Sequence, residues 1–253
     1  MNPSSPYAAR PWLEHYDYWV RPHLTYPRRA LTEILDTAAV DLPDRPATAF
    51  LGAELTFQQI KDRSDPFAAA LAGLGIAKGD RVGIMLPNCP QYIVAAFAVL
   101  RLGAIIVNVN PTYTAREVLT VANDSAMRVL ITLDRLAPLA IGVRDQTRIE
   151  HIVVTSLGEY SAEHAAPPRL DGAVAFTDLL AGARNADVPR VSIDADDVAV
   201  LQYTGGTTGT PKGAMLTHAS IFARRASIER TSAGRPAISS CCRFSTSTRS
   251  PSA

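Results

Sequence analysis

The sequence predicts an α/β fold in which helices alternate with the strands of a largely parallel sheet. Short apolar runs typical of buried strands recur about every 20–25 residues between positions 80 and 155. The segments between these runs carry helix-capping patterns and apolar residues at helical spacing. Strands and helices that alternate in this way form βαβ units, with a parallel sheet covered by helices on its faces.

Residues 1–29 are predicted to form an N-terminal arm. We expect its aromatic side chains, which lie among several prolines, to anchor the arm to the domain surface; an aromatic ligand site is the alternative. These residues are Trp12, Tyr16, Tyr18, Trp19 and Tyr26. A helix follows, because five apolar residues share one helical face: Leu31, Ile34, Leu35, Ala38 and Ala39.

The next elements have clear local signals. Residues 48–56 are typical of a short hairpin, and Thr56 with Gln59 forms a capping-box pattern that opens a helix toward Leu74. Pro66 lies inside this helix, where a proline costs about 3 kcal/mol unless a new helix starts there. A second capping box, Thr114 with Glu117, opens a helix that ends near Ser125. The other predicted elements are strands at 80–86, 104–108, 128–132 and 149–154, a helix at 89–102, and a short strand and helix within 174–183.

The most distinctive stretch runs from Leu201 to His218 and contains Tyr-Thr-Gly-Gly-Thr-Thr-Gly-Thr-Pro-Lys-Gly. Apolar runs on both sides of it predict a strand, a tight loop and a second strand. The glycines let backbone N–H groups converge on an anion, and threonine hydroxyls and the Lys212 charge add side-chain donors. We therefore expect a polyphosphate-binding loop rather than a flexible surface linker.

Two other nucleotide-binding patterns do not match. Lys212 is followed by Gly213, whereas the P-loop of NTPases places serine or threonine after its lysine. The glycines at 73, 75 and 79 are spaced one residue too widely for a dinucleotide fingerprint, and they precede a predicted strand instead of following one.

The stretch from Tyr203 to Gly213, followed by Leu-Thr-His, resembles the phosphate-loop signature of the acyl-adenylate-forming ligases, also called AMP-binding synthetases. Residues 31–133 also resemble the start of a medium- or long-chain fatty acyl-CoA ligase. The resemblance implies that residues 30–220 are the N-terminal part of the large domain of an adenylate-forming ligase, with the rest of that domain missing.

The same resemblance implies a chemistry. A fatty acid would attack ATP to give an acyl-adenylate, and coenzyme A would then displace AMP, with Mg²⁺ offsetting the phosphate charge. The residues implied to bind the β- and γ-phosphates are Thr204, Gly205, Gly206, Thr207, Thr208, Gly209, Thr210, Pro211, Lys212 and Gly213. His218 would lie near the acyl pocket; capping of the next helix is its alternative role, and no partner for a general base is evident.

Several family features find no match in the sequence. They are an aromatic-Gly-x-Thr-Glu motif for adenine and metal, an aspartate for ribose, and a small domain with a catalytic lysine. The metal ligands are therefore unknown. Residues 221–253 are rich in serine and arginine without helical or strand period, so we expect a disordered tail that results from a shifted reading frame near Ile221. A basic tail that contacts a membrane or nucleic acid is the alternative.

Composition narrows the functional classes. The net charge of +1 lacks the basic excess typical of nucleic-acid-binding domains. The three cysteines, Cys89, Cys241 and Cys242, have neither disulfide-framework nor zinc-site spacing, which predicts a reducing cytoplasm. Residues 1–10 lack a signal-peptide pattern, and Arg101 interrupts the longest apolar run, so no transmembrane segment is expected; peripheral membrane contact stays open.

The sequence therefore predicts a truncated fatty acid–CoA ligase that is inactive alone, whose parent acts on the small molecules ATP, fatty acid and CoA. Two alternatives remain. One is a non-catalytic nucleotide- or partner-binding fragment. The other is a fragment of a different adenylating enzyme, such as an aryl-acid ligase or a peptide-synthetase adenylation domain.

Overall fold

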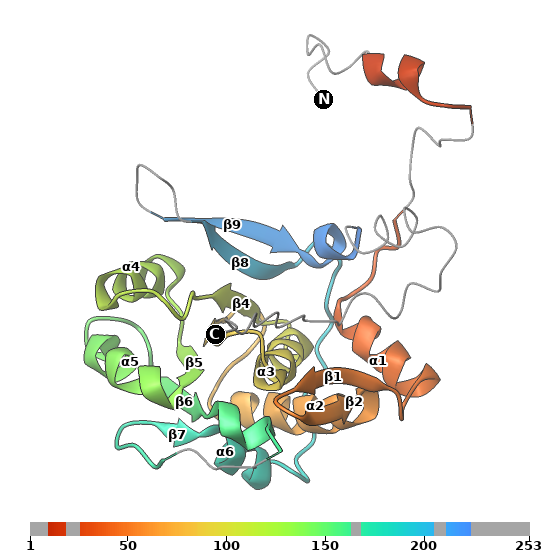
Figure 1. Ribbon diagram of the computed structural model, residues 1–253. Helices are drawn as coiled ribbons and strands as arrows, with labels where there is room; N and C mark the ends of the chain where they lie inside the picture. Colours follow the sequence, from red (N-terminus) through yellow and green to blue (C-terminus); the bar gives the residue numbers. More distant parts are fainter. Residues whose placement is uncertain (1–9, 19–25, 163–167, 205–210, 224–253) are drawn as a thin grey trace, which may run out of the picture.

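A seven-stranded sheet organises the chain (Figure 1). The computed structural model describes residues 10–18, 26–162, 168–204 and 211–223. The strand order is β7-β6-β5-β3-β4-β8-β9, in which β9 is antiparallel to β8 and every other neighbouring pair is parallel. The strands are β3 (Arg81–Met85), β4 (Ile105–Asn108), β5 (Val129–Leu133), β6 (His151–Thr155), β7 (Val174–Ala175), β8 (Val198–Thr204) and β9 (Lys212–Thr217).

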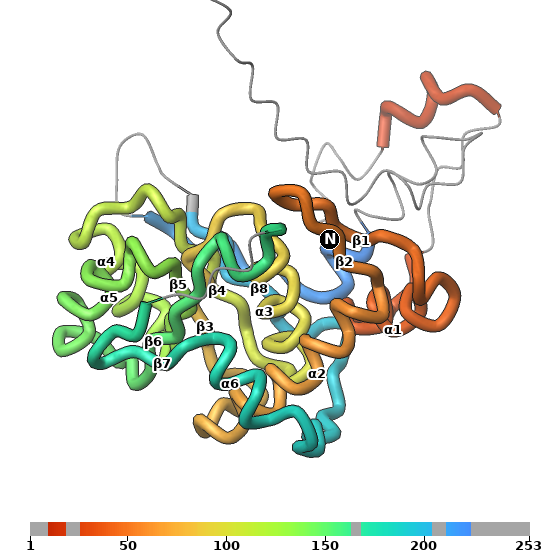
Figure 2. The backbone as a smooth tube through the Cα atoms, turned by 60° about the horizontal axis from the view of Figure 1, so that its bottom comes forward, coloured from red at the N-terminus to blue at the C-terminus, as the bar shows by residue number. Residues whose placement is uncertain are grey.

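Helices cover the two faces of the sheet and enclose two separate cores. One core lies beneath α1 (Thr32–Asp41), α2 (Phe57–Gly73), α3 (Pro90–Arg101) and α6 (Phe176–Gly182). The other core lies beneath α4 (Ala115–Ser125) and α5 (Ala137–Arg144). Figure 2 shows α2, α3 and α6 grouped together, with α4 and α5 on the other side. The prediction of an α/β fold is confirmed.

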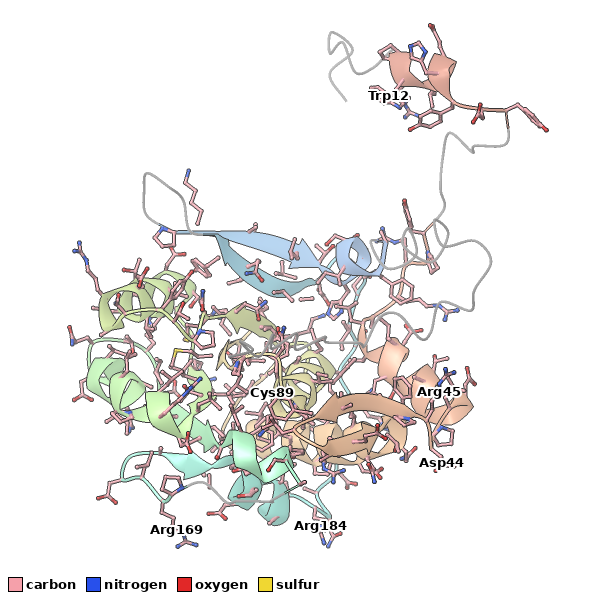
Figure 3. All side chains as sticks on the ribbon, in the orientation of Figure 1. Trp12, Asp44, Arg45, Cys89, Arg169 and Arg184 are labelled. Atoms are coloured by element: carbon pink, nitrogen blue, oxygen red, sulfur yellow. The ribbon has the colours of Figure 1, made fainter. Side chains whose placement is uncertain are left out.

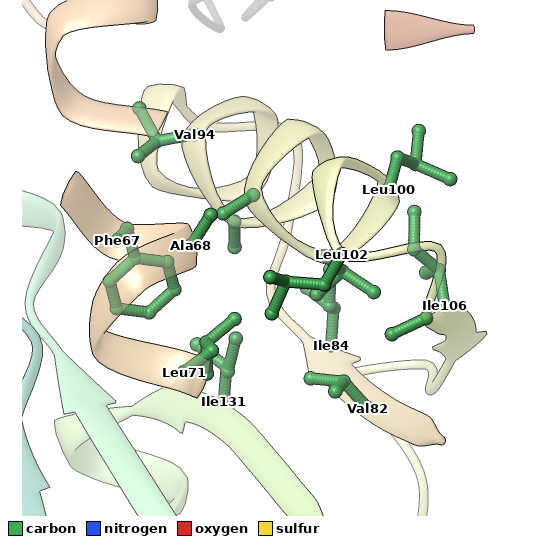
Figure 4. Packing of buried hydrophobic residues seen from close by; sticks show 14 of the residues in the cluster. Phe67, Ala68, Leu71, Val82, Ile84, Val94, Leu100, Leu102, Ile106 and Ile131 are labelled. Atoms are coloured by element: carbon green, nitrogen blue, oxygen red, sulfur yellow. The ribbon is translucent and has the colours of Figure 1, made fainter. Parts of the chain in front are cut away.

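The first core has its centre where α2 and α3 cross the middle strands (Figure 4). Phe67 and Leu71 from α2 are fully buried, as are Val82 of β3 and Ile131 of β5. Strand residues facing the two cores alternate, so β3, β5 and β6 are apolar on both faces, as expected for covered parallel strands. This two-sided burial accounts for the continuous apolar runs in the sequence.

Local signals set most helix boundaries. The Thr56 hydroxyl accepts from the Gln59 N–H at 3.2 Å, and the Gln59 side chain accepts from the Thr56 N–H at 3.1 Å, so α2 begins with the predicted capping box. Thr114 and Glu117 form the same arrangement at α4. The helix α2 continues through Pro66 as one helix. The predicted hairpin is present as β1 (Pro46–Phe50) and β2 (Ala53–Thr56).

Short 3₁₀ helices complete the described elements: η1 (Pro11–His15), η2 (Asp134–Leu136) and η3 (Leu157–Tyr160). Cys89 precedes α3 and its thiol is buried in the interior (Figure 3). Burial raises the pKa of this thiol to about 11, which keeps it protonated and poorly nucleophilic at neutral pH. The other two cysteines lie outside the described residues.

Two expectations about the ends of the chain need comment. Trp12, Tyr16 and Tyr18 are 39%, 47% and 95% exposed, so these three side chains are not buried, and the anchoring of the arm to the domain surface stays a prediction. Trp19 lies outside the described residues. At the other end, residues 218–223 are helical, and Ile221 and Phe222 pack against the first core, so ordered structure extends past residue 220. The remaining tail, 224–253, is not among the described residues.

None of the helices in the described part of the chain is long and apolar enough to cross a membrane.

Gly83 provides a stability test for the central strand. A Cβ at this position would overlap the Met127 sulfur and lie 2.8 Å from Leu130 Cδ1, so Gly83→Ala should lower the free energy of unfolding by about 1–3 kcal/mol through overpacking. Urea unfolding followed by circular dichroism measures this. The control is Gly142→Ala in α5, where no atom lies within 4 Å of the added Cβ and the helix gains up to about 1 kcal/mol. Equal effects of the two substitutions would contradict this packing argument.

Candidate functional site

A cavity of about 370 Å³ opens at the carboxyl ends of the parallel strands β3, β4 and β8. This end of an open α/β sheet is where such folds usually bind ligands. The lining residues combine amides and tyrosines with an apolar floor, and none of them is charged: Ile84, Leu86, Asn88, Tyr92, Asn108, Val109, Asn110, Tyr113, Gln202 and Tyr203. The cavity therefore suits hydrogen-bonding groups better than an isolated ion.

A chain of side-chain hydrogen bonds crosses the wall of this cavity. The Tyr92 hydroxyl donates to Asn108 Oδ1 at 2.7 Å, and Asn108 Nδ2 donates to Gln202 Oε1 at 2.7 Å. Gln202 Nε2 makes a longer contact of 3.4 Å with the carbonyl of Tyr203. These hydrogen bonds connect Tyr92 of α3 to Asn108 at the end of β4, and Asn108 to Gln202 near the end of β8.

Tyr203 lies on the opposite face of β8 and belongs to the second core. Its hydroxyl donates a hydrogen bond to the Asp124 carboxylate of α4. Burial and this carboxylate raise the pKa of Tyr203, so the hydroxyl remains a donor. Gly213 faces it across the hairpin: a Cβ on Gly213 would lie 3.0 Å from Tyr203 Cζ, so the ring packs where a side chain would otherwise be.

The predicted strand–loop–strand is present as the β8–β9 hairpin at one edge of the sheet (Figure 1). Thr204 pairs with Lys212 as the last register pair before the loop, and Lys212 is exposed. The hairpin thus brings Thr204, Pro211, Lys212 and Gly213 to the carboxyl end of β8, beside the cavity. Gly205, Gly206, Thr207, Thr208, Gly209 and Thr210 lie outside the described residues, so their phosphate contacts stay a prediction.

The structure does not bring His218 to this site. Because β9 runs back along β8, His218 follows its far end, about 20 Å from Lys212. The imidazole is 1% exposed, and its Nδ1 accepts a hydrogen bond from the Leu31 N–H at 3.1 Å. The helix cap is the hydroxyl of Thr217, which accepts from the Ser220 N–H at 3.2 Å. His218 is therefore placed as a buried contact between α1 and the end of the hairpin.

No group of three or more His, Cys, Asp or Glu side chains that could hold an ion occurs in the part of the chain that the structure describes. The ammonium of Lys212 forms no ion pair with another described residue, so it is available to an anion at the loop. Phosphate binding at Lys212 stays a prediction, and the ligands of Mg²⁺ stay unknown.

Comparison with known families decides the class. The family model described as "AMP-binding enzyme" matches residues 35–243. The chain belongs to the AMP-binding enzyme family. The match spans both cores and the β8–β9 hairpin, and it continues into the segment that we expected to be frameshifted.

Relatives and solved structures agree with this assignment. A long-chain-fatty-acid–CoA ligase of Salmonella typhimurium is 36% identical over 237 residues, covering 87% of this chain and 42% of the relative. A solved long-chain-fatty-acid–CoA ligase from Archaeoglobus fulgidus has a TM-score of 0.65 and 26% identity, over 82% of this chain and 40% of that one. An anthranilate CoA ligase solved with anthranoyl-AMP has a TM-score of 0.64 and 26% identity, over 78% and 36%. The chain spans less than half the length of these proteins.

Sequence reasoning missed four residues that shape the site: Tyr92, Asn108, Asp124 and Gln202. A usable signal existed for two of them, because Asn108 and Gln202 each follow a run of apolar residues near the end of a predicted strand. Polar residues at the ends of adjacent parallel strands lie at one edge of the sheet. The signal was incomplete, because the adjacency of β4 and β8 is not visible in the sequence.

His218 gives the stability of the chain a pH dependence. Burial lowers its pKa below 6.5, although nearby Asp197 opposes this and Lys78 adds to it. The unfolded chain then binds more protons than the folded chain below pH 6.5, so stability is complete above that pH and is lost as pH falls. His218→Asn, which keeps an acceptor for Leu31, should flatten the decline in unfolding free energy as the pH falls below about 6.5. Chemical denaturation across this range measures it.

The matched control is His15→Asn, which removes an exposed histidine. It should leave the acid decline as in the parent chain. An unchanged decline in His218→Asn would show that other groups cause the acid sensitivity.

Proposed function

We propose that the chain is the N-terminal part of a fatty acid–CoA ligase, and that its β8–β9 loop binds the phosphates of ATP. The observation that carries this proposal is the position of Thr204 and Lys212, which flank the Gly/Thr stretch, at the carboxyl end of a parallel strand beside a cavity. Backbone N–H groups and one lysine in such a place suit a polyphosphate. The name of the Salmonella typhimurium relative favours a fatty acid as the acyl substrate.

The chemistry of the proposal follows from the poor reactivity of a carboxylate. The carboxylate oxygen attacks the α-phosphorus of ATP, and pyrophosphate leaves to give an acyl-adenylate. The thiol of CoA then attacks the acyl carbon, and AMP leaves with the electron pair of the broken bond. The first step brings two anions together, so its barrier falls mainly through positioning and preorganised positive charge. The part of this that we assign to the described residues is phosphate binding, with Lys212 as the charge.

A second candidate is a fragment of an aryl-acid ligase, favoured by the similarity to the anthranilate CoA ligase. The described residues do not separate the two acid classes, because the amides, tyrosines and three apolar residues that line the cavity specify neither a fatty nor an aryl group. A peptide-synthetase adenylation fragment and a non-catalytic nucleotide- or partner-binding fragment remain further alternatives. Cytoplasmic location and peripheral membrane contact stay predictions.

The 253-residue chain should make no detectable acyl-CoA. It spans 42% of the Salmonella relative, and the residues for adenine, ribose and the catalytic lysine were not found in its sequence. Pyrophosphate release and CoA-thiol consumption, measured with a fatty acid series and with an aryl acid, check this. Robust turnover of any acid would show that the chain contains catalytic groups that we have not recognised, and the acid preferred would decide between the two candidates.

The coding sequence tests whether the tail is a product of a shifted frame. Reading the DNA past codon 221 in all three frames should reveal the missing adenine and lysine motifs in an alternative frame. Closed or unrelated frames over the next few hundred codons would contradict this.

Lys212→Ala should weaken binding of ATP or inorganic tripolyphosphate to this chain. A charge-assisted contact contributes about 1.5–3 kcal/mol, which corresponds to roughly 10- to 150-fold in the dissociation constant. Thr207→Ala should weaken binding less, because it removes one neutral donor. Isothermal titration calorimetry at fixed ionic strength measures both. The control is Arg169→Ala, which removes an exposed positive charge near β7, at the opposite edge of the sheet (Figure 3).

If Lys212→Ala and Arg169→Ala weaken phosphate binding equally, the loss of affinity follows from the change in net charge. That result would contradict the proposed role of Lys212. Binding of ATP and tripolyphosphate with similar affinity is expected, because the family's motifs for adenine and ribose were not found in the sequence.

A further inference from the structure

The parallel pairing of β8 with β4 ends at Gln202, two residues before the end of β8. Strands β4 and β8 pair at Ile106 with Val200, Val107 with Leu201, and Asn108 with Gln202. Beyond the last of these pairs β4 has ended, and Tyr203 and Thr204 pair only with the edge strand β9. The side chains of Asn108 and Gln202 therefore form a hydrogen bond at the last register pair between β4 and the strand that enters the loop.

This contact has a defined direction. Asn108 Nδ2 donates to Gln202 Oε1, and the remaining Asn108 oxygen accepts from the Tyr92 hydroxyl, with both distances 2.7 Å. Reversing the Gln202 amide would place its oxygen against the Tyr203 carbonyl, where the nitrogen now lies at 3.4 Å. The geometry thus favours one arrangement of the two amides, held from α3 by Tyr92.

The opposite face of β8 is held separately. The next residue, Tyr203, donates to Asp124 of α4, and its ring fills the space beside Gly213. Consecutive residues of β8 are therefore fixed from opposite sides of the sheet, one by an amide and one by a carboxylate. The strand reaches the loop with both its position and its rotation about the strand axis constrained.

We propose that Asn108 is a positioning residue of the phosphate loop. It holds Gln202, and through Gln202 it sets the position of Thr204 at the end of β8. The inference rests on the proposed phosphate-binding role of that loop. A phosphate cradle made of backbone N–H groups depends on the placement of its two strand ends, because its donors cannot adjust individually as side chains can.

The arrangement separates positioning from general stability. The three backbone register pairs between β4 and β8 do not depend on the Asn108 side chain, and Asn108 lines an open cavity and is only partly buried. Loss of its amide should therefore leave the cores intact and change the loop.

The experiment measures binding of inorganic tripolyphosphate with Mg²⁺ by isothermal titration calorimetry, and the unfolding temperature of each variant. Asn108→Ala should weaken binding about tenfold with an unfolding temperature close to that of the parent chain. Gln202→Met, which keeps the volume but removes the amide, should weaken binding equally. The double variant should be no weaker than either single variant, because both remove the same contact.

Two further variants complete the test. Tyr92→Phe removes only the hydroxyl at the outer end of the chain and should give a smaller loss in the same direction. Gln58→Ala removes an exposed amide hydrogen bond to Asp62 on α2 and should leave binding unchanged.

Hydrogen exchange gives a readout that is independent of affinity. In Asn108→Ala, amide exchange should rise at residues 202–204 and 212–213 and stay unchanged in the strands β5 and β6. A uniform rise throughout the sheet would indicate a purely structural role and would overturn the proposal.

The outcomes distinguish the two levels of inference. Suppose that Lys212→Ala binds tripolyphosphate weakly, whereas Asn108→Ala and Gln202→Met bind it as the parent chain does. This result would overturn the positioning role of Asn108 and would leave the phosphate-binding role of Lys212 in place. Additive losses in the double variant would show that the two amides act separately, which also overturns it. No binding by the parent chain would overturn the phosphate role and the positioning role together.

Discussion

The parallel pairing of β8 with β4 is the interaction on which the candidate site depends. Only three register pairs join the hairpin to the sheet, and the residues that supply them lie far apart in the sequence. The pairing places the end of β8 beside the ends of β3 and β4, and this placement creates the cavity. Without it, the end of β8 would lie apart from the amides, tyrosines and apolar residues that line the cavity.

A second set of contacts holds the helical layer that covers the first core. Arg101 of α3 makes paired hydrogen bonds of 2.6 and 2.7 Å to Asp36 of α1, and Lys61 of α2 lies between Asp36 and Asp65 at 2.9 and 2.6 Å. The cluster is partly buried, so its charges are less screened than those of an exposed pair. It fixes three helices relative to one another beside the His218 contact with α1.

The sequence predicted the elements well because their causes are local. Capping boxes at Thr56 and Thr114 act within four residues, and two-sided burial makes each central strand a short apolar run. The strand order could not be predicted, because it depends on which strands meet in space. The same limit applies to His218: its distance from Lys212 follows from the direction of β9, and its implied place near an acyl pocket stays a prediction.

In the candidate site, too, local motifs could be predicted from the sequence, whereas contacts between distant residues could not. The loop motif and Lys212 could be recognised in the sequence alone. Gly213 was included in that motif as an implied phosphate contact, whereas the structure gives it a packing role. Its small size accommodates the Tyr203 ring. Asn108 and Asp124 lie 94 and 79 residues from their partners in β8, so no local pattern could pair them.

This long separation has a consequence during synthesis. At about 5–20 residues per second, the ribosome takes roughly 5–20 s to make the chain between β4 and β8. During that interval the β4 edge has no neighbour on one side, and it carries unpaired N–H and C=O groups that another strand could join. The contact between Leu31 and His218 spans 187 residues and can form only later still. The nascent chain therefore passes through a stage in which the β4 edge of the partly made sheet is exposed, and a foreign strand can pair with it before β8 is made.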